Sequence, residues 1–430
     1  MGFVGRILIF VCSLPVIAAT PDPAPAPVSE KVQDFVRLPR WLTLKLELRG
    51  RFENPIGPVR PPAYDDSYYL HRLRFQAGVK LPAGFRLYAE LQDSEEIGYK
   101  PRPLPGTLVD TFDLRQAYVE YIPVEHSRWR VRAGRQALAY GETRLIGSSN
   151  WGNVGPSWDA AHLAYASPGV RVEAFASSPV FPVAREFDTP HTWTKLSGVY
   201  STFDKLVPKG LVEAYVFWKA QGEGCSHLPG GLSTETWGFR AVGRLPLAFD
   251  YNTETAIQTG RAGIQTVRSW AGHYALGYML PRKIHPIAQF DYATGDGNPN
   301  DRYLHTFDQL YPTYKWGTAD GFGWRNIQDA AAGADWAPRK NLTVRIAGHW
   351  FWLADRRDSL YSQSNTVYVK GFNASNGKVG DEVELRGEYR LNRHIRFTAG
   401  TARMFPGPYL KEAGRGSAYQ TWFVMWNYTI

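Results

Sequence analysis

Short turns alternate along this chain with longer, irregular connections, and no other feature of the sequence constrains the fold as strongly. Eight turns each separate two runs in which apolar and polar residues alternate; they lie at residues 81–84, 123–126, 167–169, 207–210, 246–248, 281–283, 338–341 and 391–394. Between these hairpins we expect connections of roughly ten to thirty residues, because outer-membrane barrels have short turns at one rim and long loops at the other. Eight turns and nine loops connect eighteen strands. The sequence therefore predicts an all-β fold, a closed antiparallel transmembrane β-barrel of about 18 strands.

The predicted strands carry their large apolar residues on one face. In the run 42–49 leucine occupies every second position, starting at residue 42. The residues between the leucines are Thr43, Lys45, Glu47 and Arg49. The runs 72–81, 344–352 and 382–391 follow the same period of two. A barrel wall with lipid outside and a polar lumen inside requires this pattern. A soluble β-sandwich would show the same alternation with its apolar face buried.

Composition separates a barrel from a helical membrane protein. After the first twenty residues no apolar stretch approaches the roughly 18 residues of a spanning helix, and the mean hydropathy is slightly hydrophilic. A helical bundle is thereby excluded. The chain contains 15 Trp, 24 Tyr and 22 Phe, which suits aromatic girdles at the two membrane interfaces.

The N-terminus indicates secretion. Arg6 precedes an apolar run that ends in Ala18-Ala19, so residues 1–19 are predicted to be a signal peptide. Residues 20–40 form a Pro-rich periplasmic lead, and residues 41–430 form the barrel. Cleavage would leave Cys225 as the single cysteine, so neither an intrachain disulfide nor a CxxC site is expected. The predicted location is the outer membrane of a Gram-negative bacterium.

The C-terminus reads as a barrel strand that runs to the last residue. Trp422, Val424, Trp426, Tyr428 and Ile430 alternate with other residues to the end of the sequence. Many outer-membrane barrels end on such a strand, with a terminal Phe or Trp where this chain has isoleucine. An ordinary buried final strand is the alternative.

Basic residues outnumber acidic residues on the polar faces of the clearly alternating strands. Such an excess inside a narrow wall concentrates anions, and the planar fork of arginine matches a carboxylate. Packing of the lumen by Arg/Glu networks is the alternative. Nucleic-acid binding is not expected, since the cations alternate with lipid-facing residues. The arginines predicted to contact an anionic solute are Arg49, Arg72, Arg74, Arg130, Arg132, Arg240, Arg345, Arg386 and Arg390.

Catalytic, cofactor and metal motifs are not recognised in the sequence. It contains no GxSxG elbow, HExxH, P-loop or dinucleotide fingerprint. Histidines such as His273, His285 and His349 have no identifiable partner and are expected to be structural. Residues 296–301 resemble a calcium loop in spacing but lack its glycine and its final glutamate, so a polar loop is the favoured reading. We therefore predict no catalytic residue, no cofactor and no metal ligand.

Several motifs together resemble the alginate export family of outer-membrane porins. The resemblance spans most of the chain and implies a monomeric barrel of eighteen strands whose arginine-lined constriction selects an anionic polysaccharide. It adds Arg135 and Arg144 to the predicted solute contacts. The motifs are His71-Arg72-Leu73-Arg74-Phe75, Leu114-Arg115-Gln116-Ala117-Tyr118, Ala133-Gly134-Arg135-Gln136, Tyr140-Gly141, Trp151-Gly152-Asn153, Trp158-Asp159, Tyr292-Ala293-Thr294-Gly295-Asp296, Thr306-Phe307-Asp308-Gln309-Leu310-Tyr311-Pro312 and Val379-Gly380-Asp381-Glu382-Val383.

The sequence therefore predicts a porin, not an enzyme, that passes an anionic polysaccharide or oligosaccharide, in the export direction. Its expected partners are that saccharide, outer-membrane lipid and periplasmic secretion proteins. A general or small-solute anion uptake porin is the first alternative. A barrel hydrolase is the second, because Glu382, Glu384 and Glu388 share a face.

Overall fold

The structure is a computed structural model that describes residues 38–57, 66–100, 104–124, 127–148, 151–298, 300–319 and 321–430. The predicted signal peptide and all but the end of the Pro-rich lead lie outside the described residues. None of the described helices is long and apolar enough to cross a membrane.

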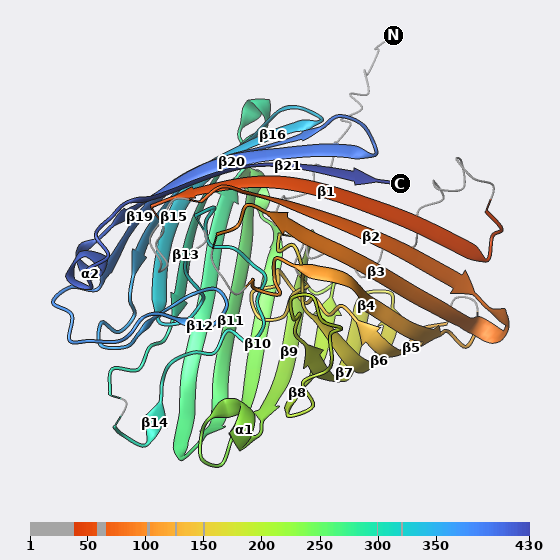
Figure 1. Cartoon of the computed structure of the whole chain (residues 1–430), viewed down its shortest axis with the longest axis horizontal. Coiled ribbons are helices and arrows are strands. Elements are labelled where there is room, and N and C mark those ends of the chain that lie inside the picture. Colours follow the sequence, from red (N-terminus) through yellow and green to blue (C-terminus); the bar gives the residue numbers. More distant parts are fainter. Residues whose placement is uncertain are drawn as a thin grey trace, which may run out of the picture.

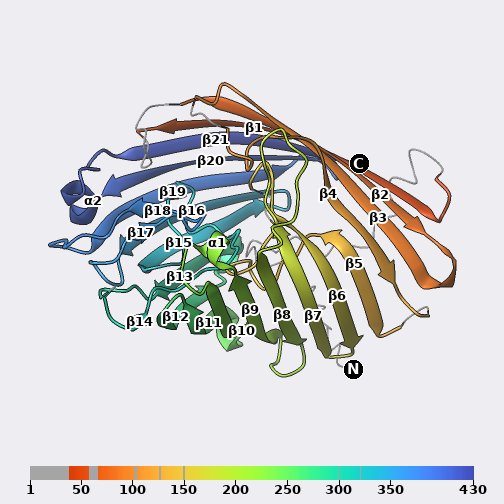
Figure 2. The same cartoon turned by 60° about the horizontal axis from the view of Figure 1, so that its bottom comes forward.

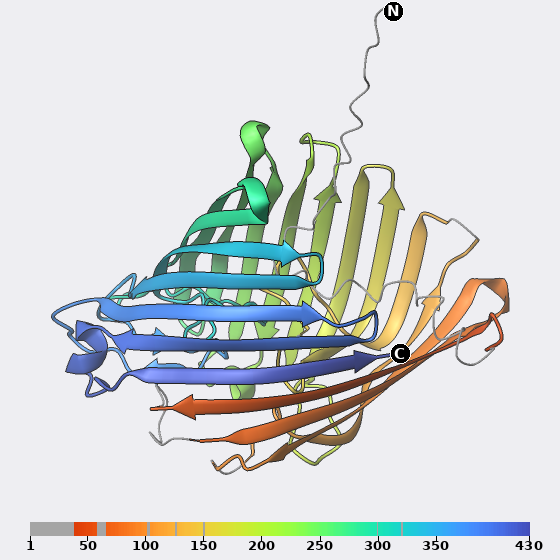
Figure 3. The ribbon, with the colours of Figure 1, turned by 90° about the horizontal axis from the view of Figure 1, so that it is seen from above.

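Eighteen antiparallel strands form a closed barrel, as predicted. Each strand pairs with its neighbours along the chain, and β21 pairs with β1 to close the wall, so the two lie side by side in Figures 1 and 3. The barrel strands are β1 (Leu42–Ile56), β2 (Tyr68–Lys80), β3 (Phe85–Ile97), β4 (Asp110–Tyr121), β5 (Trp129–Gln136), β6 (Ser157–Ser167), β7 (Val170–Val180), β8 (Thr194–Phe203), β9 (Gly210–Gln221), β10 (Leu232–Arg244), β11 (Phe249–Ala262), β12 (Gln265–Tyr278), β13 (Ile284–Ala293), β15 (Ile327–Arg339), β16 (Leu342–Trp352), β19 (Lys378–Arg390), β20 (Ile395–Pro406) and β21 (Tyr419–Thr429).

All eight predicted turns join neighbouring strands at one rim of the barrel. Three of them contain a short 3-10 turn that starts with proline, at Pro82–Gly84, Pro246–Ala248 and Pro281–Lys283. In each, the residue after the proline has a positive φ. Proline fixes the first φ of the turn, and the left-handed residue then reverses the chain direction.

The connections at the other rim are long, with one exception that corrects the prediction. Only Gly263 and Ile264 lie between β11 and β12, because these two strands are longer than most and meet in a hairpin. Gly263 has a φ of +60°, and two-residue hairpin turns require such a positive φ. Short elements lie within the other loops: α1 (Glu223–Ser226), β14 (Tyr303–Leu304), β17 (Leu360–Tyr361), β18 (Val367–Val369) and α2 (Pro408–Glu412).

The outer face of the wall is apolar, as the alternation predicts. Ile346 is 55% exposed and Val119 is 43% exposed, whereas the polar residues between such positions point inward. Leu73, Phe75, Val383, Leu385, Trp422 and Val424 are likewise exposed. A continuous apolar exterior on a closed sheet suits a lipid environment, because the backbone groups are all paired within the wall.

Arginine at a lipid-facing position is expected to destabilise the barrel. Ile346→Arg and Val119→Arg should each lower the free energy of unfolding in lipid by about 2 to 4 kcal/mol at mid-membrane depth. Val124, in the turn after β4, is the matched control, and Val124→Arg should cost near zero. Denaturant titration in vesicles measures all three. Wild-type stability of both wall variants would contradict the assigned strand faces.

Candidate functional site

Two long loops fold into the barrel and narrow its lumen. The 137–156 loop connects β5 to β6, and the 294–326 loop connects β13 to β15; both run through the space that the strands enclose (Figure 2). They pair with each other through backbone hydrogen bonds, from Tyr311 N to Leu145 O at 2.7 Å and from Gly147 N to Tyr311 O at 3.0 Å. Their buried apolar side chains join one core cluster with residues of the wall. The two loops therefore form one inner plug.

Arginines of β1 and β2 hold the 137–156 loop against the wall. Arg49 and Arg72 are directly opposite each other in the β1–β2 register, and both point inward. Arg49 donates to Gly152 O at 3.0 Å and to Asn153 Oδ1 at 2.8 Å, and Arg72 donates to Gly152 O at 3.1 Å. Arg51 donates to Trp151 O. Loop carbonyls therefore lie between these like charges, and the carboxylates of Glu47 and Glu53 pair with Arg72 and Arg51, respectively.

An ion-pair network fixes the other end of the same loop to β9, β10 and β11. Arg144 contacts Glu142 at 2.7 Å and Glu254 at 3.0 Å, and Arg240 contacts Glu142 at 2.9 Å and Glu213 at 2.5 Å. Burial alone would raise the pKa of Glu142, but Arg144 and Arg240 lower that pKa to about 2. This carboxylate therefore stays ionised, and both guanidiniums have compensated charges.

The 294–326 loop is fixed mainly by carboxylates of the wall. Glu384 accepts hydrogen bonds from Thr318 N at 2.8 Å and from Thr318 Oγ1, while Glu382 accepts one from Ala319 N at 3.0 Å. On the opposite side of the loop, Lys219 donates to Asp308 at 2.6 Å. The loop is thus held on two sides of the barrel.

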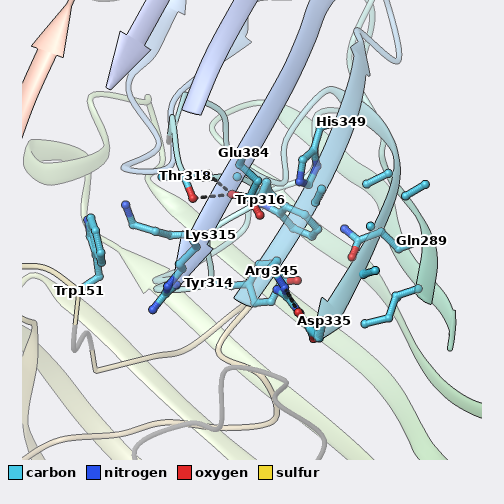
Figure 4. A pocket seen from close by; sticks show the side chains of 18 of the residues that line it. Trp151, Gln289, Tyr314, Lys315, Trp316, Thr318, Asp335, Arg345, His349 and Glu384 are labelled. Atoms are coloured by element: carbon cyan, nitrogen blue, oxygen red, sulfur yellow. Dashed lines mark hydrogen bonds and ion pairs between the residues drawn. The ribbon is translucent and has the colours of Figure 1, made fainter. Parts of the chain in front are cut away.

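A cavity, partly open to solvent, remains between this plug and strands β13, β15, β16 and β19. Figure 4 shows Arg345, Lys315 and Glu384 around it, with aromatic rings from the two loops. Its lining thus combines cations, carboxylates and aromatic surfaces. The aromatic residues are Trp151, Tyr314, Trp316 and Phe423.

Two arginines of this cavity face each other across neighbouring strands. Arg345 of β16 is directly opposite Arg386 of β19 in the register. Asp335 binds Arg345 through two hydrogen bonds, of 2.7 and 2.9 Å. Arg386 is exposed to the lumen. Like charges opposed across strands are destabilising, so a carboxylate entering the cavity would relieve their repulsion.

Lys315 adds a third cation at the edge of the cavity. Its ammonium lies 4.1 Å from the centre of the Trp151 ring, and Arg51 lies 4.4 Å from the same ring. Trp151 also packs edge-on against Phe423, with ring centres 4.7 Å apart. The Trp151 ring therefore contacts both Arg51 of β1 and Lys315 at the edge of the cavity.

The other predicted solute contacts are distributed around the wall, and most of them have protein partners. Arg74 is buried beside Gln92 and Glu90, Arg132 binds Glu120, and Arg135 binds Asp159. Arg130 and Arg390 are exposed, and Arg390 lies opposite Arg396 near the turn rim. The structure therefore brings only Arg345 and Arg386 of the predicted set together in the cavity. Direct contact of any of these arginines with a solute stays a prediction.

Three histidines for which the sequence showed no partner each lie beside an aspartate in the structure. The buried His273 and His349 lie 2.6 Å from Asp291 and 2.9 Å from Asp329, respectively. His285 lies 2.7 Å from Asp250. The sequence did not reveal these partners because each aspartate belongs to a different strand that only the barrel register places alongside.

Sequence reasoning missed the loop residues of the cavity. Trp151, Tyr314, Lys315 and Trp316 lie in loops, where no period of two assigns side chains to the lumen, although Trp151 begins one of the family-like motifs. The density of aromatic residues in the tract 311–316 was the available signal.

Asp358 contacts the start of the 296–301 loop, where its carboxylate accepts a hydrogen bond from Asp296 N at 2.9 Å. That this loop binds no metal stays a prediction.

Comparisons with known proteins agree with this architecture. A family model described as alginate export matches residues 40–424. No curated protein matches the chain. Solved structures that resemble it include Pseudomonas aeruginosa OccK11 (OpdR), at 11% identity and a TM-score of 0.62, over 90% of this chain and 96% of that one. P. aeruginosa OpdK with vanillate has 8% identity and a TM-score of 0.63, over 90% and 98%. At such low identity these likenesses show the fold alone.

Loosening the plug is expected to widen the lumen. Asn153 is fully buried, and its amide also donates to Leu108 O at 2.8 Å. Asn153→Ala should cost about 1 to 3 kcal/mol by leaving these partners unsatisfied, and it should raise the single-channel conductance and its noise in planar bilayers. Asn373→Ala, at an exposed loop position, is the control and should change neither. A variant with wild-type conductance would show that Asn153 does not hold the plug.

Proposed function

Because the chain belongs to the alginate export family, we propose that it passes an anionic polysaccharide or oligosaccharide, alginate-like in its carboxylates, outward through the outer membrane of a Gram-negative bacterium. In that setting the turn rim faces the periplasm and the long loops face outside. The protein acts as a monomer, and as the exit pore of an export complex it meets periplasmic secretion partners. Family and fold are those of porins, so the proposed activity is passive passage.

The opposed Arg345 and Arg386 in the open cavity carry this proposal. A uronate polymer offers one carboxylate per sugar, and an arginine fork binds a carboxylate through two parallel hydrogen bonds. Asp335 already occupies the fork of Arg345. A polymer carboxylate therefore exchanges with an internal one, and such exchange keeps binding weak enough for release.

The aromatic surfaces beside these cations suit a sugar ring. Trp316 and Tyr314 line the same cavity as Arg345, with their ring centres 4.8 Å apart. Aromatic side chains offer apolar faces to the C–H face of a pyranose, while the cations take its carboxylate. The cavity thus matches the two chemical features of a uronate, and a neutral sugar would use only one of them.

Uptake of small carboxylates is the second candidate. The plug leaves a narrow lumen, and the fold is shared with OpdK, whose structure contains vanillate. A small aromatic acid would use the same cations and rings without needing a continuous path for a polymer. Permeation separates the two: a small-solute porin passes monocarboxylates of vanillate size and is not occupied by longer oligouronates.

Charge reversal in the cavity should change ion selectivity. In Arg345→Glu/Arg386→Glu, the wall beside the plug becomes negative, so the preference for chloride over potassium should fall or reverse in reversal-potential measurements. Arg282→Glu, in an exposed turn, makes one charge reversal away from the lumen and should leave selectivity unchanged. If the double variant kept the wild-type reversal potential, Arg345 and Arg386 would not lie on an anion path.

Oligouronates should block the open-channel current at concentrations where neutral oligosaccharides of equal length do not. Added salt should weaken that block, because screening reduces the attraction between carboxylates and the wall cations. The double variant Arg345→Glu/Arg386→Glu should lose the block. Equal, salt-insensitive block by charged and neutral sugars would indicate stacking on aromatic rings alone and would contradict the carboxylate mechanism.

A further inference from the structure

Three aspartates lie together at the loop rim, away from the cavity of the plug. Asp110 and Asp113 are the first and fourth residues of strand β4, and Asp188 lies in the 181–193 loop between β7 and β8. One carboxylate oxygen of each lies within 4.8 Å of the others. The three residues are only 2%, 1% and 8% exposed, respectively. Buried carboxylates this close together require compensation.

Among the described residues no Lys, Arg or His forms an ion pair with any of these three carboxylates, although the charge of Arg135 acts on Asp188 from beside it. The guanidinium of Arg135 binds the carboxylate of Asp159 and reaches only the backbone oxygen of Asp188, at 3.0 Å. The hydrogen bonds that the cluster accepts come from neutral groups: Val183 N donates to Asp188 at 2.8 Å, and Asp188 N donates to Asp113 at 2.9 Å.

Asp110 gives an independent indication of a missing ligand. Its Oδ2 accepts one long hydrogen bond, from Gln92 at 3.4 Å, while its Oδ1 is buried and has no hydrogen-bond partner. A buried carboxylate oxygen without a donor is rare in folded proteins. An ion between the three side chains would satisfy it.

We propose that Asp110, Asp113 and Asp188 bind a divalent cation, Ca²⁺, that fastens the 181–193 loop to the start of β4. Calcium takes oxygen ligands at about 2.3 to 2.6 Å in flexible geometry, so ligands on opposite sides of the ion lie about 5 Å apart. The spacing of the three oxygens fits this limit. Magnesium needs a near-octahedral shell at about 2.1 Å, whereas three carboxylates from a strand and a separate loop suit the more flexible shell of calcium. Water completes the shell.

Protonation is the competing way to compensate the charge. Burial raises the pKa of Asp188 to about 7, and the neighbouring Asp113 adds to this shift. Such a carboxyl would hold a proton near neutral pH when no cation is bound. Calcium binding displaces that proton, so the binding test must be made at a pH above 7.

The sequence did not indicate this site. Asp113 and Asp188 are 75 residues apart, and neither lies in a recognised calcium motif. The site forms because the 181–193 loop reaches past β5 and β6 to β4. Its ion would therefore brace a loop at the mouth of the barrel, independently of what passes through the lumen.

Calcium binding to the purified full-length protein tests the proposal. After removal of divalent ions with chelator, equilibrium dialysis against ⁴⁵Ca²⁺ at pH 8 should find one site per chain, with a dissociation constant on the order of 0.1 to 1 mM, as in extracellular modules. Asp188→Asn and Asp113→Asn should each weaken binding at least about tenfold. Asp204→Asn, at an exposed turn position, should leave it unchanged. No saturable binding by the wild type, or equal binding by all three variants, would overturn the site.

Limited proteolysis of the wild type gives a second readout that needs no variant. Arg185 is an exposed trypsin site within the 181–193 loop, with its side chain 64% accessible. Calcium should slow cleavage after Arg185 at least about fivefold, while cleavage after Lys205, in an exposed turn at the other rim, serves as the internal control. Equal cleavage rates at Arg185 with and without calcium would also overturn the proposal.

Discussion

The structure depends on closure of the sheet, because a backbone exposed to lipid cannot leave hydrogen-bonding groups unpaired. Pairing of β21 with β1 removes the two edges that an open sheet of eighteen strands would have. Once the wall is closed, each strand has one face toward the outside and one toward the lumen. Ile346 and Arg345 are adjacent in sequence, yet one is on the apolar exterior and the other lines the inner cavity.

Closure also decides how charge is handled inside. The lumen carries many arginines, and a wall with only arginines would be strongly self-repelling. Two kinds of compensation occur: loop carbonyls between Arg49 and Arg72, and the carboxylates around Arg144 and Arg240. In the cavity Asp335 binds Arg345, and Arg386 beside it is exposed to the lumen. A mobile anion can therefore reach Arg386, while Arg49, Arg72 and Arg240 help to position the plug.

The plug links the wall to the proposed passage. Its two loops are paired with each other and held by hydrogen bonds to side chains on opposite sides of the barrel. Such polar contacts depend on exact placement, and a single lost partner affects several of them. In the proposed function, a solute would pass beside these cations and aromatic rings, so a lumen narrowed in this way would select by chemistry as well as by size.

The sequence by itself determined the strand number, the turns and the inward or outward direction of side chains, because these follow from a period of two and from turn chemistry that acts over a few residues. It also indicated a basic lumen, since the face of each arginine can be read from its own strand. Only the tertiary structure decided which arginines remain available. Arg49 and Arg386 look equivalent in sequence, but a loop more than a hundred residues from Arg49 covers it, whereas Arg386 is exposed to the lumen. The histidine–aspartate pairs, the cavity residues of the 294–326 loop and the cluster of Asp110, Asp113 and Asp188 likewise depend on contacts between distant segments, whose positions are set by barrel register and loop packing.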